Sequence, residues 1–280
     1  MIILKYLICT SCGSADLVCL DSGGAIVCRQ CGTRYRVING IPALVPPEMI
    51  HFSEVPVSER QRFMSAKNLA YFGNSPVSLM YNHYHRYAAA GRRKCGATPL
   101  TLDIGSGIGE HYPFVTSSEK DACSFIGVDL DRFKLEHYLA QHPEIPLLQA
   151  DAAALPLGDS LFDCVQLLAT LEHFHGDQLR KVIAEAVRVL KPGGLLIACY
   201  PAEGSLLLKA GQKAMHALIR IRTGFDLDLE SVHHHVASAA EIGVALAENR
   251  EIVSLESSYY PLNLLSSHLA LFVNELYRKR

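Results

Sequence analysis

The chain has 280 residues, of which 49% are hydrophobic and 19% are charged, and its formal net charge at pH 7 is −2. This composition is typical of a globular protein with room for one large domain and a small one, and it excludes a disordered chain. The near-neutral charge disfavours a protein held to nucleic acid through phosphates over its whole surface, although a local basic patch would be enough for binding.

The sequence contains no apolar run that approaches the ~20 residues of a membrane span. The opening stretch MIILKYLI has neither the basic region nor the small-residue cleavage site of a signal peptide. Cysteines in a metal-binding pattern indicate a reducing compartment. We therefore expect a cytoplasmic protein, and the sequence does not indicate its oligomeric state.

Four of the nine cysteines form two equal pairs near the start of the chain. Cys9 and Cys12 lie in CTSCG, Cys28 and Cys31 lie in CRQCG, and fifteen residues separate the two pairs. Two residues between thiols let both sulfurs contact one tetrahedral ion at ~2.3 Å, and the following glycine permits the tight turn. Four thiolates leave no open coordination position, so we expect a structural zinc ion. The Pro-rich stretch that follows marks the end of this unit, and the sequence predicts a zinc ribbon over residues 1–46.

Residues 47–98 are expected to form a helical linker or cap, and residues 99–280 a larger domain in which strands and helices alternate. Short apolar runs bounded by turn residues predict buried parallel strands, so we expect a doubly wound α/β sheet. The predicted strands are 100–104, 124–129, 146–149, 162–168, 195–200, 251–257 and 268–277. The predicted helices are 58–72, 77–93, 108–118, 131–141, 177–190, 203–222 and 238–248, with an insertion at about 203–237.

The stretch LDIGSGIGEH after the first of these strands has the character of a cofactor-binding turn. Gly105, Gly107 and Gly109 are spaced G-x-G-x-G, whereas a dinucleotide turn requires G-x-G-x-x-G. Asp103 and Glu110 add negative charge, which would repel a pyrophosphate. The same charge suits a cofactor that carries an amine and a sulfonium, which indicates S-adenosylmethionine.

Further polar residues follow the next strands. Asp129 ends the second strand, 22 residues after Gly107, where a carboxylate can accept hydrogen bonds from both ribose hydroxyls. Leu130 is placed to cover one face of an adenine ring. Asp151, after the third strand, is placed to accept from the adenine amino group.

With these ordered motifs, residues 98–200 resemble the class I S-adenosylmethionine-dependent methyltransferases, and in particular the subgroup that contains quinone-biosynthesis C-methyltransferases. The resemblance implies a seven-stranded, mostly parallel sheet whose last two strands form an antiparallel hairpin. It also implies that the turn borders the methionyl part of the cofactor, that Asp129 holds the ribose and that Asp151 meets the adenine. The implied cofactor-binding residues are Asp103, Gly105, Ser106, Gly107, Gly109, Asp129, Leu130, Asp151, Ala152 and Leu168.

The cysteine-rich unit ends in a stretch that supports the same family. Residues 35–42, YRVINGIP, match the end of a zinc-ribbon module that is often fused to, or partnered with, methyltransferases, with Arg36 for a proline and Asn39 for an aspartate.

Methyl transfer from a sulfonium needs proximity and orientation, and a base only where the acceptor must lose a proton. Segments that follow strands or lie in the insertion supply candidates for this role: Glu172, His173, His175, Tyr200, Glu203 and His233–His235. The segment from Tyr200 to Val236 also resembles, more loosely, an insertion in methyltransferases from polysaccharide gene clusters. That resemblance implicates Glu203 and His235, and together with His173 they are the expected catalytic residues. The sequence does not favour a metal ion bound by His233 and His235, because no third ligand is evident.

Three functions remain open at this point. The first is an enzyme that methylates a small molecule or a glycan-type acceptor. The second is an RNA base methyltransferase of the type that acts on ribosomal guanine, for which Arg92, Arg93, Lys94 and basic residues of the ribbon would supply a basic patch. The third is a partner-binding module in which the ribbon docks a protein and catalysis is residual.

Overall fold

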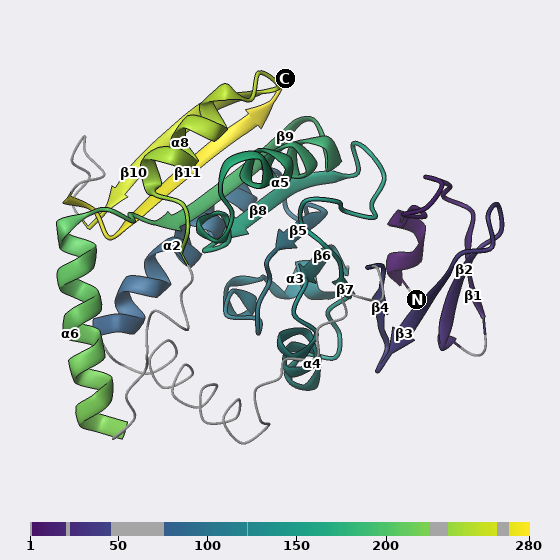
Figure 1. Ribbon diagram of the computed structural model, residues 1–280, viewed down its shortest axis with the longest axis horizontal. Helices are drawn as coiled ribbons and strands as arrows, with labels where there is room; N and C mark the ends of the chain where they lie inside the picture. The colour runs from purple at the N-terminus through teal and green to yellow at the C-terminus, as the bar shows by residue number, and fades with distance from the viewer. Residues whose placement is uncertain (1, 21–22, 46–75, 122, 224–234, 262–268) are drawn as a thin grey trace.

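A computed structural model describes residues 2–20, 23–45, 76–121, 123–223, 235–261 and 269–280. One mixed sheet of eleven strands runs through these residues, in the order β1-β2-β3-β4-β7-β6-β5-β8-β9-β11-β10 (Figure 1). The helix expected over 58–72, together with His233 and His234, lies outside the described residues.

Seven neighbouring strands of this sheet correspond to the predicted α/β domain. The five strands β5 to β9 pair with one another in parallel. Strands β10 and β11 pair as an antiparallel hairpin, and β11 also pairs antiparallel with β9. The seven strands are β5 (Thr101–Ile104), β6 (Phe125–Asp129), β7 (Leu147–Gln149), β8 (Phe162–Leu168), β9 (Leu190–Pro201), β10 (Ile252–Tyr260) and β11 (Phe272–Lys279).

The remaining four strands belong to the cysteine-rich unit and extend the sheet at its β7 edge. They are β1 (Leu17–Leu20), β2 (Ala25–Cys28), β3 (Arg34–Ile38) and β4 (Ile41–Ala43). Ala43 of β4 pairs in parallel with Gln149 of β7, and Leu44 N–H donates to the Gln149 carbonyl at 3.0 Å. The sequence predicted a ribbon that precedes a separate seven-stranded sheet, and the structure corrects this to one continuous sheet.

Side chains on the β1–β4 unit also contribute to the core of the larger domain. Leu7 pairs with Leu157, and Ile8 N–H donates to the Pro156 carbonyl at 2.9 Å. Arg132, buried at the start of α4 (Arg132–Gln141), donates to the backbone carbonyls of Ile38 and Ile41. The cysteine-rich unit is therefore packed against the domain rather than tethered to it.

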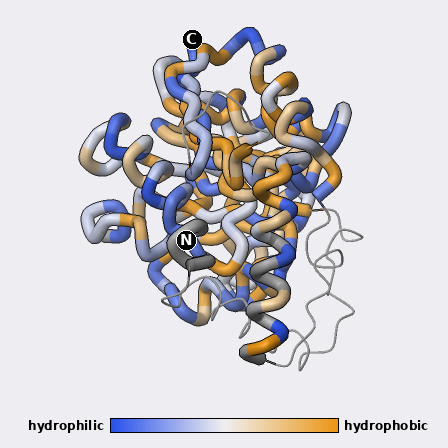
Figure 2. The backbone as a smooth tube through the Cα atoms, turned by 90° about the vertical axis from the view of Figure 1, so that its left-hand side faces the viewer, coloured by the Kyte–Doolittle hydropathy of each residue, from blue (hydrophilic) through white to orange (hydrophobic). Residues whose placement is uncertain are grey.

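Helices cover both faces of the sheet, which confirms the doubly wound architecture. On one face α5 (Gly176–Val189) contacts α8 (Ala239–Glu248) and the central strands, and on the other lie α2 (Pro76–Arg93) and α4. Alternation along β9 shows the division: Leu196 and Ala198 pack in the core beneath α5, and Leu195 and Ile197 pack with α2. Apolar segments accordingly lie mainly inside the molecule and polar turns outside (Figure 2).

The helix predicted over 108–118 is wrong. After the glycine turn the chain forms the short 3-10 helix η4 (Tyr112–Phe114) and one turn of helix, α3 (Ser117–Asp121). Gly107 and Gly109 have φ values of 57° and 88°, which a right-handed helix does not contain, and Pro113 has no N–H to donate. These three residues explain why the regular helix does not form.

The insertion contains the predicted helix as α6 (Leu206–Thr223), which lies at the left-hand side of the molecule in Figure 1. Within the described residues, no helix combines the length and the apolar character that crossing a membrane requires.

Candidate active site

The glycine turn connects β5 to η4 at the carboxyl end of the parallel strands, where ligands bind in open α/β sheets. Gly105 N–H and Ser106 N–H both donate to the Val128 carbonyl, at 2.8 and 2.9 Å, so the turn lies across the end of β6. A Cβ atom on Gly105 would approach Thr170 Oγ1 to 2.4 Å, and one on Gly109 would approach the Tyr138 ring to 2.5 Å. The turn therefore requires glycine for space as well as for its positive φ angles.

Asp129 lies directly beside this turn. Its Oδ2 accepts from Gly107 N–H at 2.9 Å, and its Oδ1 accepts from Asp131 N–H at 2.8 Å. Each carboxylate oxygen has a second lone pair, so both oxygens retain the capacity to accept from a diol. Leu130 follows Asp129 and is half-buried.

Asp151 and Ala152 lie near Asp129, since Ala150 N–H donates to the Asp129 carbonyl at 3.2 Å. Asp151 Oδ1 accepts from Ala153 N–H at 2.9 Å, which fixes the turn after β7. Leu168 is buried at the end of β8. Nine of the ten residues that the sequence predicted for the cofactor thus follow or end neighbouring parallel strands, and Asp103 is the penultimate residue of β5.

Asp103 is buried in β5, opposite Gln166 of β8. Burial raises the pKa of the Asp103 carboxyl to about 7, and the effect is moderated by hydrogen bonding from Gln166 and by the charge of Arg92. A cationic ligand would stabilise the ionised carboxylate, because its charge compensates for the hydration that the carboxylate loses on burial.

Arg92 lies at the centre of a buried polar network that was not predicted from the sequence. Its Nε donates to Glu119 Oε1 at 2.9 Å, its Nη1 donates to Gln166 Oε1 at 3.2 Å and contacts His111 Nε2. His111 Nδ1 lies 3.0 Å from His85 Nδ1. Residues 85, 88 and 92 follow helical i, i+3, i+7 spacing, and that periodicity was the available signal that Arg92 and His85 share the buried face.

The network also removes part of the predicted basic patch. Arg92 is 1% exposed, and Lys94 forms an ion pair with Glu256 at 2.7 Å. Arg93 and Lys5 remain exposed.

Ser106 gives one further indication that a ligand belongs here. Its hydroxyl oxygen is buried and has no hydrogen-bond partner among the described residues. A buried polar atom without a partner is costly, so the position suits a polar ligand group. The chemistry of these residues fits S-adenosylmethionine. Asp103 is suited to its amine, Asp129 is suited to its ribose diol, and the glycine turn leaves room for a ligand to approach the backbone closely.

The three residues expected to be catalytic lie together beyond β8 and β9. His235 Nδ1 is 2.5 Å from Glu203 Oε1, and the His235 and His173 rings meet edge to face with centroids 5.3 Å apart. Val236 N–H and Ala237 N–H donate to the Glu172 carbonyl at 2.8 and 3.2 Å, which holds the end of the insertion against η5 (Leu171–His173).

Glu172, in η5, lies beside the three residues His173, Glu203 and His235. It is 1% exposed, and burial raises the pKa of its carboxyl to about 7 although His235 opposes the shift. The other candidate bases are arranged differently. Tyr200 is buried and donates its hydroxyl to Glu275 Oε2 at 2.8 Å, and His175 is exposed at the start of α5.

The four predicted metal-binding cysteines converge. Their sulfur atoms lie within 4.8 Å of one another, with Cys9 and Cys31 at 3.5 Å and Cys12 and Cys28 at 3.6 Å. Thiolates arranged tetrahedrally around zinc at ~2.3 Å would be ~3.8 Å apart. Gly13 N–H donates to the Cys9 carbonyl and Gly32 N–H to the Cys28 carbonyl, at 2.8 and 2.9 Å, so the two pairs form equivalent turns. The donor set fits a structural zinc ion.

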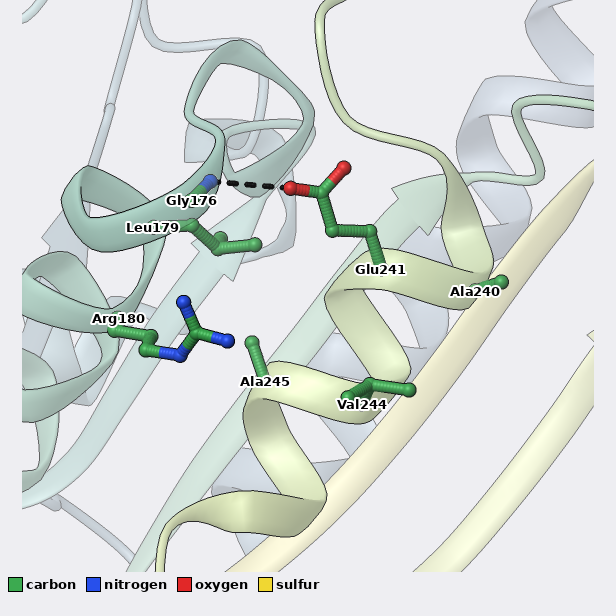
Figure 3. A pocket seen from close by; sticks show the side chains of 7 residues that line it. All are labelled: Gly176, Leu179, Arg180, Ala240, Glu241, Val244 and Ala245. Atoms are coloured by element: carbon green, nitrogen blue, oxygen red, sulfur yellow. Dashed lines mark hydrogen bonds between the residues drawn. The ribbon is translucent and has the colours of Figure 1, made fainter.

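A pocket of about 250 Å³ opens between α5 and α8 (Figure 3). Its lining is mostly apolar, and Gly176 N–H donates to Glu241 Oε1 at its edge, at 3.1 Å. It shares no residue with the glycine turn or with the group around His235, so it is not the candidate active site.

Comparison with known proteins agrees with this geometry. Residues 102–198 match the family model described as a methyltransferase domain. The chain is 34% identical over 107 residues to a demethylmenaquinone methyltransferase of Renibacterium salmoninarum, which is 36% of this chain and 42% of that protein. It is 32% identical over 147 residues to phthiotriol/phenolphthiotriol dimycocerosates methyltransferase 1 of Mycobacterium ulcerans, which is 46% of this chain and 51% of that protein. The chain therefore spans about half, or less, of the length of these relatives.

The fold is also that of a solved methyltransferase. The N-methyltransferase NodS of Bradyrhizobium japonicum, in complex with S-adenosyl-L-homocysteine, superposes with a TM-score of 0.51 at 16% identity. The match covers 79% of this chain and 97% of NodS. At this level of identity the likeness concerns the fold alone.

Proposed function

We propose that this chain, whose residues 102–198 match a methyltransferase domain, is a class I S-adenosylmethionine-dependent methyltransferase that transfers a methyl group to a small-molecule or glycan-type acceptor. The observation that carries the proposal is the contact between Asp129 and Gly107, which sets a carboxylate for the ribose directly against the glycine turn. The other residues proposed to bind the cofactor lie in or directly after neighbouring parallel strands, which supports the proposal.

Each part of the cofactor has a partner of suitable chemistry. Asp103 and the turn Gly105–Gly109, with Ser106, would hold the methionyl part, Asp129 the ribose, and Leu130, Asp151, Ala152 and Leu168 the adenine. When bound, the cofactor supplies an electrophilic methyl group on a sulfonium. The chain supplies orientation, since a displacement at carbon requires the attacking atom in line with the leaving sulfur.

The acceptor is proposed to bind beside His173, Glu203 and His235. His173 follows β8 and Glu203 follows β9, and His235, from the segment before α8, contacts both. The two relatives are named for demethylmenaquinone and for phthiotriol/phenolphthiotriol dimycocerosates, which supports a small-molecule acceptor. An RNA acceptor is less well supported, because Arg92 is buried within the domain instead of forming a basic surface. A cytoplasmic location and a structural zinc ion in residues 1–46 belong to the same proposal.

Calorimetric titration of the zinc-loaded protein tests the proposal, with NAD as the comparison ligand. We expect S-adenosylmethionine alone to bind, and Asp129→Ala to weaken its affinity at least tenfold, about 1.4 kcal/mol. Asp177→Ala is the control, since that side chain is 96% exposed on α5. Binding of NAD, or of neither ligand, would refute the proposed function.

A further inference from the structure

Beyond the cofactor residues, one group of side chains has the composition of a metal site. Glu172, His173 and His235 offer one ligand atom each, and these three atoms lie within 4.8 Å of one another. Glu172 and His173 come from η5, whereas His235 comes from the segment before α8. Two distant parts of the chain therefore bring two imidazoles and one carboxylate together.

The buried carboxylate of Glu172 has an oxygen left over. Glu172 Oε2 is inaccessible to solvent and has no hydrogen-bond partner among the described residues. Glu172 Oε1 lies 3.9 Å from His235 Nε2, which is too long for a hydrogen bond. Two ligands that each lie ~2.1 Å from one ion are separated by up to ~4.2 Å, so this spacing suits shared coordination.

Glu203 orients the imidazole for that role. With the Nδ1 proton of His235 donated to Glu203 Oε1, 2.5 Å away, Nε2 carries the lone pair that faces Glu172. A carboxylate behind a ligating histidine is the usual arrangement at metal sites, because it fixes the tautomer and raises the basicity of the ligand. The exposed position of His173 leaves the site open on its solvent side.

We propose that Glu172, His173 and His235 bind one divalent first-row transition-metal ion, with Glu203 as a positioning residue. Two imidazoles and one carboxylate favour such an ion over Mg²⁺ or Ca²⁺, which prefer oxygen ligands. Three protein ligands leave coordination positions open for an acceptor.

The acceptor class follows from those open positions, and this step rests on the proposed function. A metal-bound hydroxyl has a lowered pKa, so an alcohol or phenol on the ion loses its proton to solvent and becomes a nucleophile. Its oxygen forms a bond to the methyl carbon, the bond from that carbon to sulfur breaks, and the sulfonium becomes the neutral thioether of S-adenosylhomocysteine. The site therefore indicates an O-methyl acceptor that carries a hydroxyl able to bind the ion.

Titration with Mn²⁺ alone tests the site, with free Mn²⁺ followed by electron paramagnetic resonance in the zinc-loaded full chain. Thiolates of the ribbon prefer zinc, so Mn²⁺ reports the oxygen and nitrogen site. We expect one bound Mn²⁺, an affinity at least tenfold lower in Glu172→Gln and in His235→Gln, and a fall of about tenfold or more in Glu203→Gln. His175→Gln, two residues from His173 and exposed, is the matched control and should bind Mn²⁺ normally.

Metal analysis covers the case in which the purified protein already holds an ion at this site. A second metal ion per chain that is lost in Glu172→Gln and His235→Gln supports the inference. No second ion together with no Mn²⁺ binding, or binding that these variants leave unchanged, overturns it.

A parallel titration with S-adenosylmethionine separates the two proposals and shows whether each variant is folded. Retained cofactor binding with no metal site overturns the metal inference alone. Loss of cofactor binding in the unmodified chain overturns the proposed function, whatever the metal result.

Discussion

The raised pKa of Asp103 makes cofactor affinity depend on pH. Burial holds this pKa at about 7, whereas a carboxyl in the unfolded chain titrates near ~3.9. The proposed partner of Asp103 is the amine of S-adenosylmethionine, which prefers the ionised carboxyl. The fraction of Asp103 that is ionised falls from about one half at pH 7 to about one hundredth at pH 5, while an α-amine stays protonated. Affinity should therefore fall about fifty-fold over this range, about 2.3 kcal/mol.

Loss of affinity at pH 5 would not reflect loss of folding through this group. Between pH ~4 and pH about 7, Asp103 is protonated to a greater extent in the folded protein than in the unfolded chain. The contribution of this residue to the free energy of unfolding therefore decreases as the pH rises through that range, and it is greatest below the range. Acidification thus favours the folded state at this position while it disfavours the charged cofactor.

Calorimetric titrations with S-adenosylmethionine at pH 5, 6 and 7 measure the effect. Asp103→Asn is the essential control, because it keeps the shape of the residue and cannot ionise. We expect weaker binding in this variant, with most of the slope between pH 5 and 7 removed. An unchanged slope in Asp103→Asn, or a flat profile in the unmodified chain, would refute the reasoning.

Three further predictions concern stability. Gly109→Ala should cost about 1–3 kcal/mol more than Gly193→Ala in chemical denaturation, because both glycines have positive φ but only Gly109 lies against a ring, and equal costs would show that the Tyr138 contact is unimportant. Arg92→Leu should lower the free energy of unfolding by about 3–5 kcal/mol, because it leaves Glu119 buried without its cation. Lys94→Ala, at an exposed ion pair, should lower it by less than about 1 kcal/mol, and similar values for the two variants would contradict the buried network. Cys12→Ser should abolish zinc binding at the four-cysteine site and unfold residues 5–45 while cofactor binding persists, and Cys19→Ser should do neither, as metal analysis and calorimetry would show.

Local sequence signals predicted most of the α/β domain. The strand expected over 162–168 is β8 within the same bounds, because an apolar run between turn residues has few alternatives in a buried parallel sheet. Signals that depend on packing were not visible in the same way. The pairing of Ala43 with Gln149 joins segments that are more than a hundred residues apart, and no local pattern specifies it.

The candidate site also contains features that local sequence patterns predict and features that depend on packing. The convergence of Cys9, Cys12, Cys28 and Cys31 was predicted from spacing alone, because one ion would need sulfurs at fixed separations. The meeting of Glu172 with His235 was not predicted, because it depends on the bonds from Val236 and Ala237 to the Glu172 carbonyl. Those bonds bring His235 back to η5, beside Glu172 and His173, whereas His233, which the sequence analysis paired with it, lies outside the described residues.

Thr170 connects the two halves of the site. Its hydroxyl donates to the Ile104 carbonyl at 3.0 Å, and its side chain fills the space where a Cβ atom of Gly105 would lie. Two residues later, Glu172 begins the proposed metal site. These contacts hold the exit of β8 against the glycine turn and so link the proposed cofactor side to the proposed acceptor side. Because an in-line methyl transfer depends on the separation of its two reacting atoms, we expect this link to contribute to the geometry of the proposed reaction.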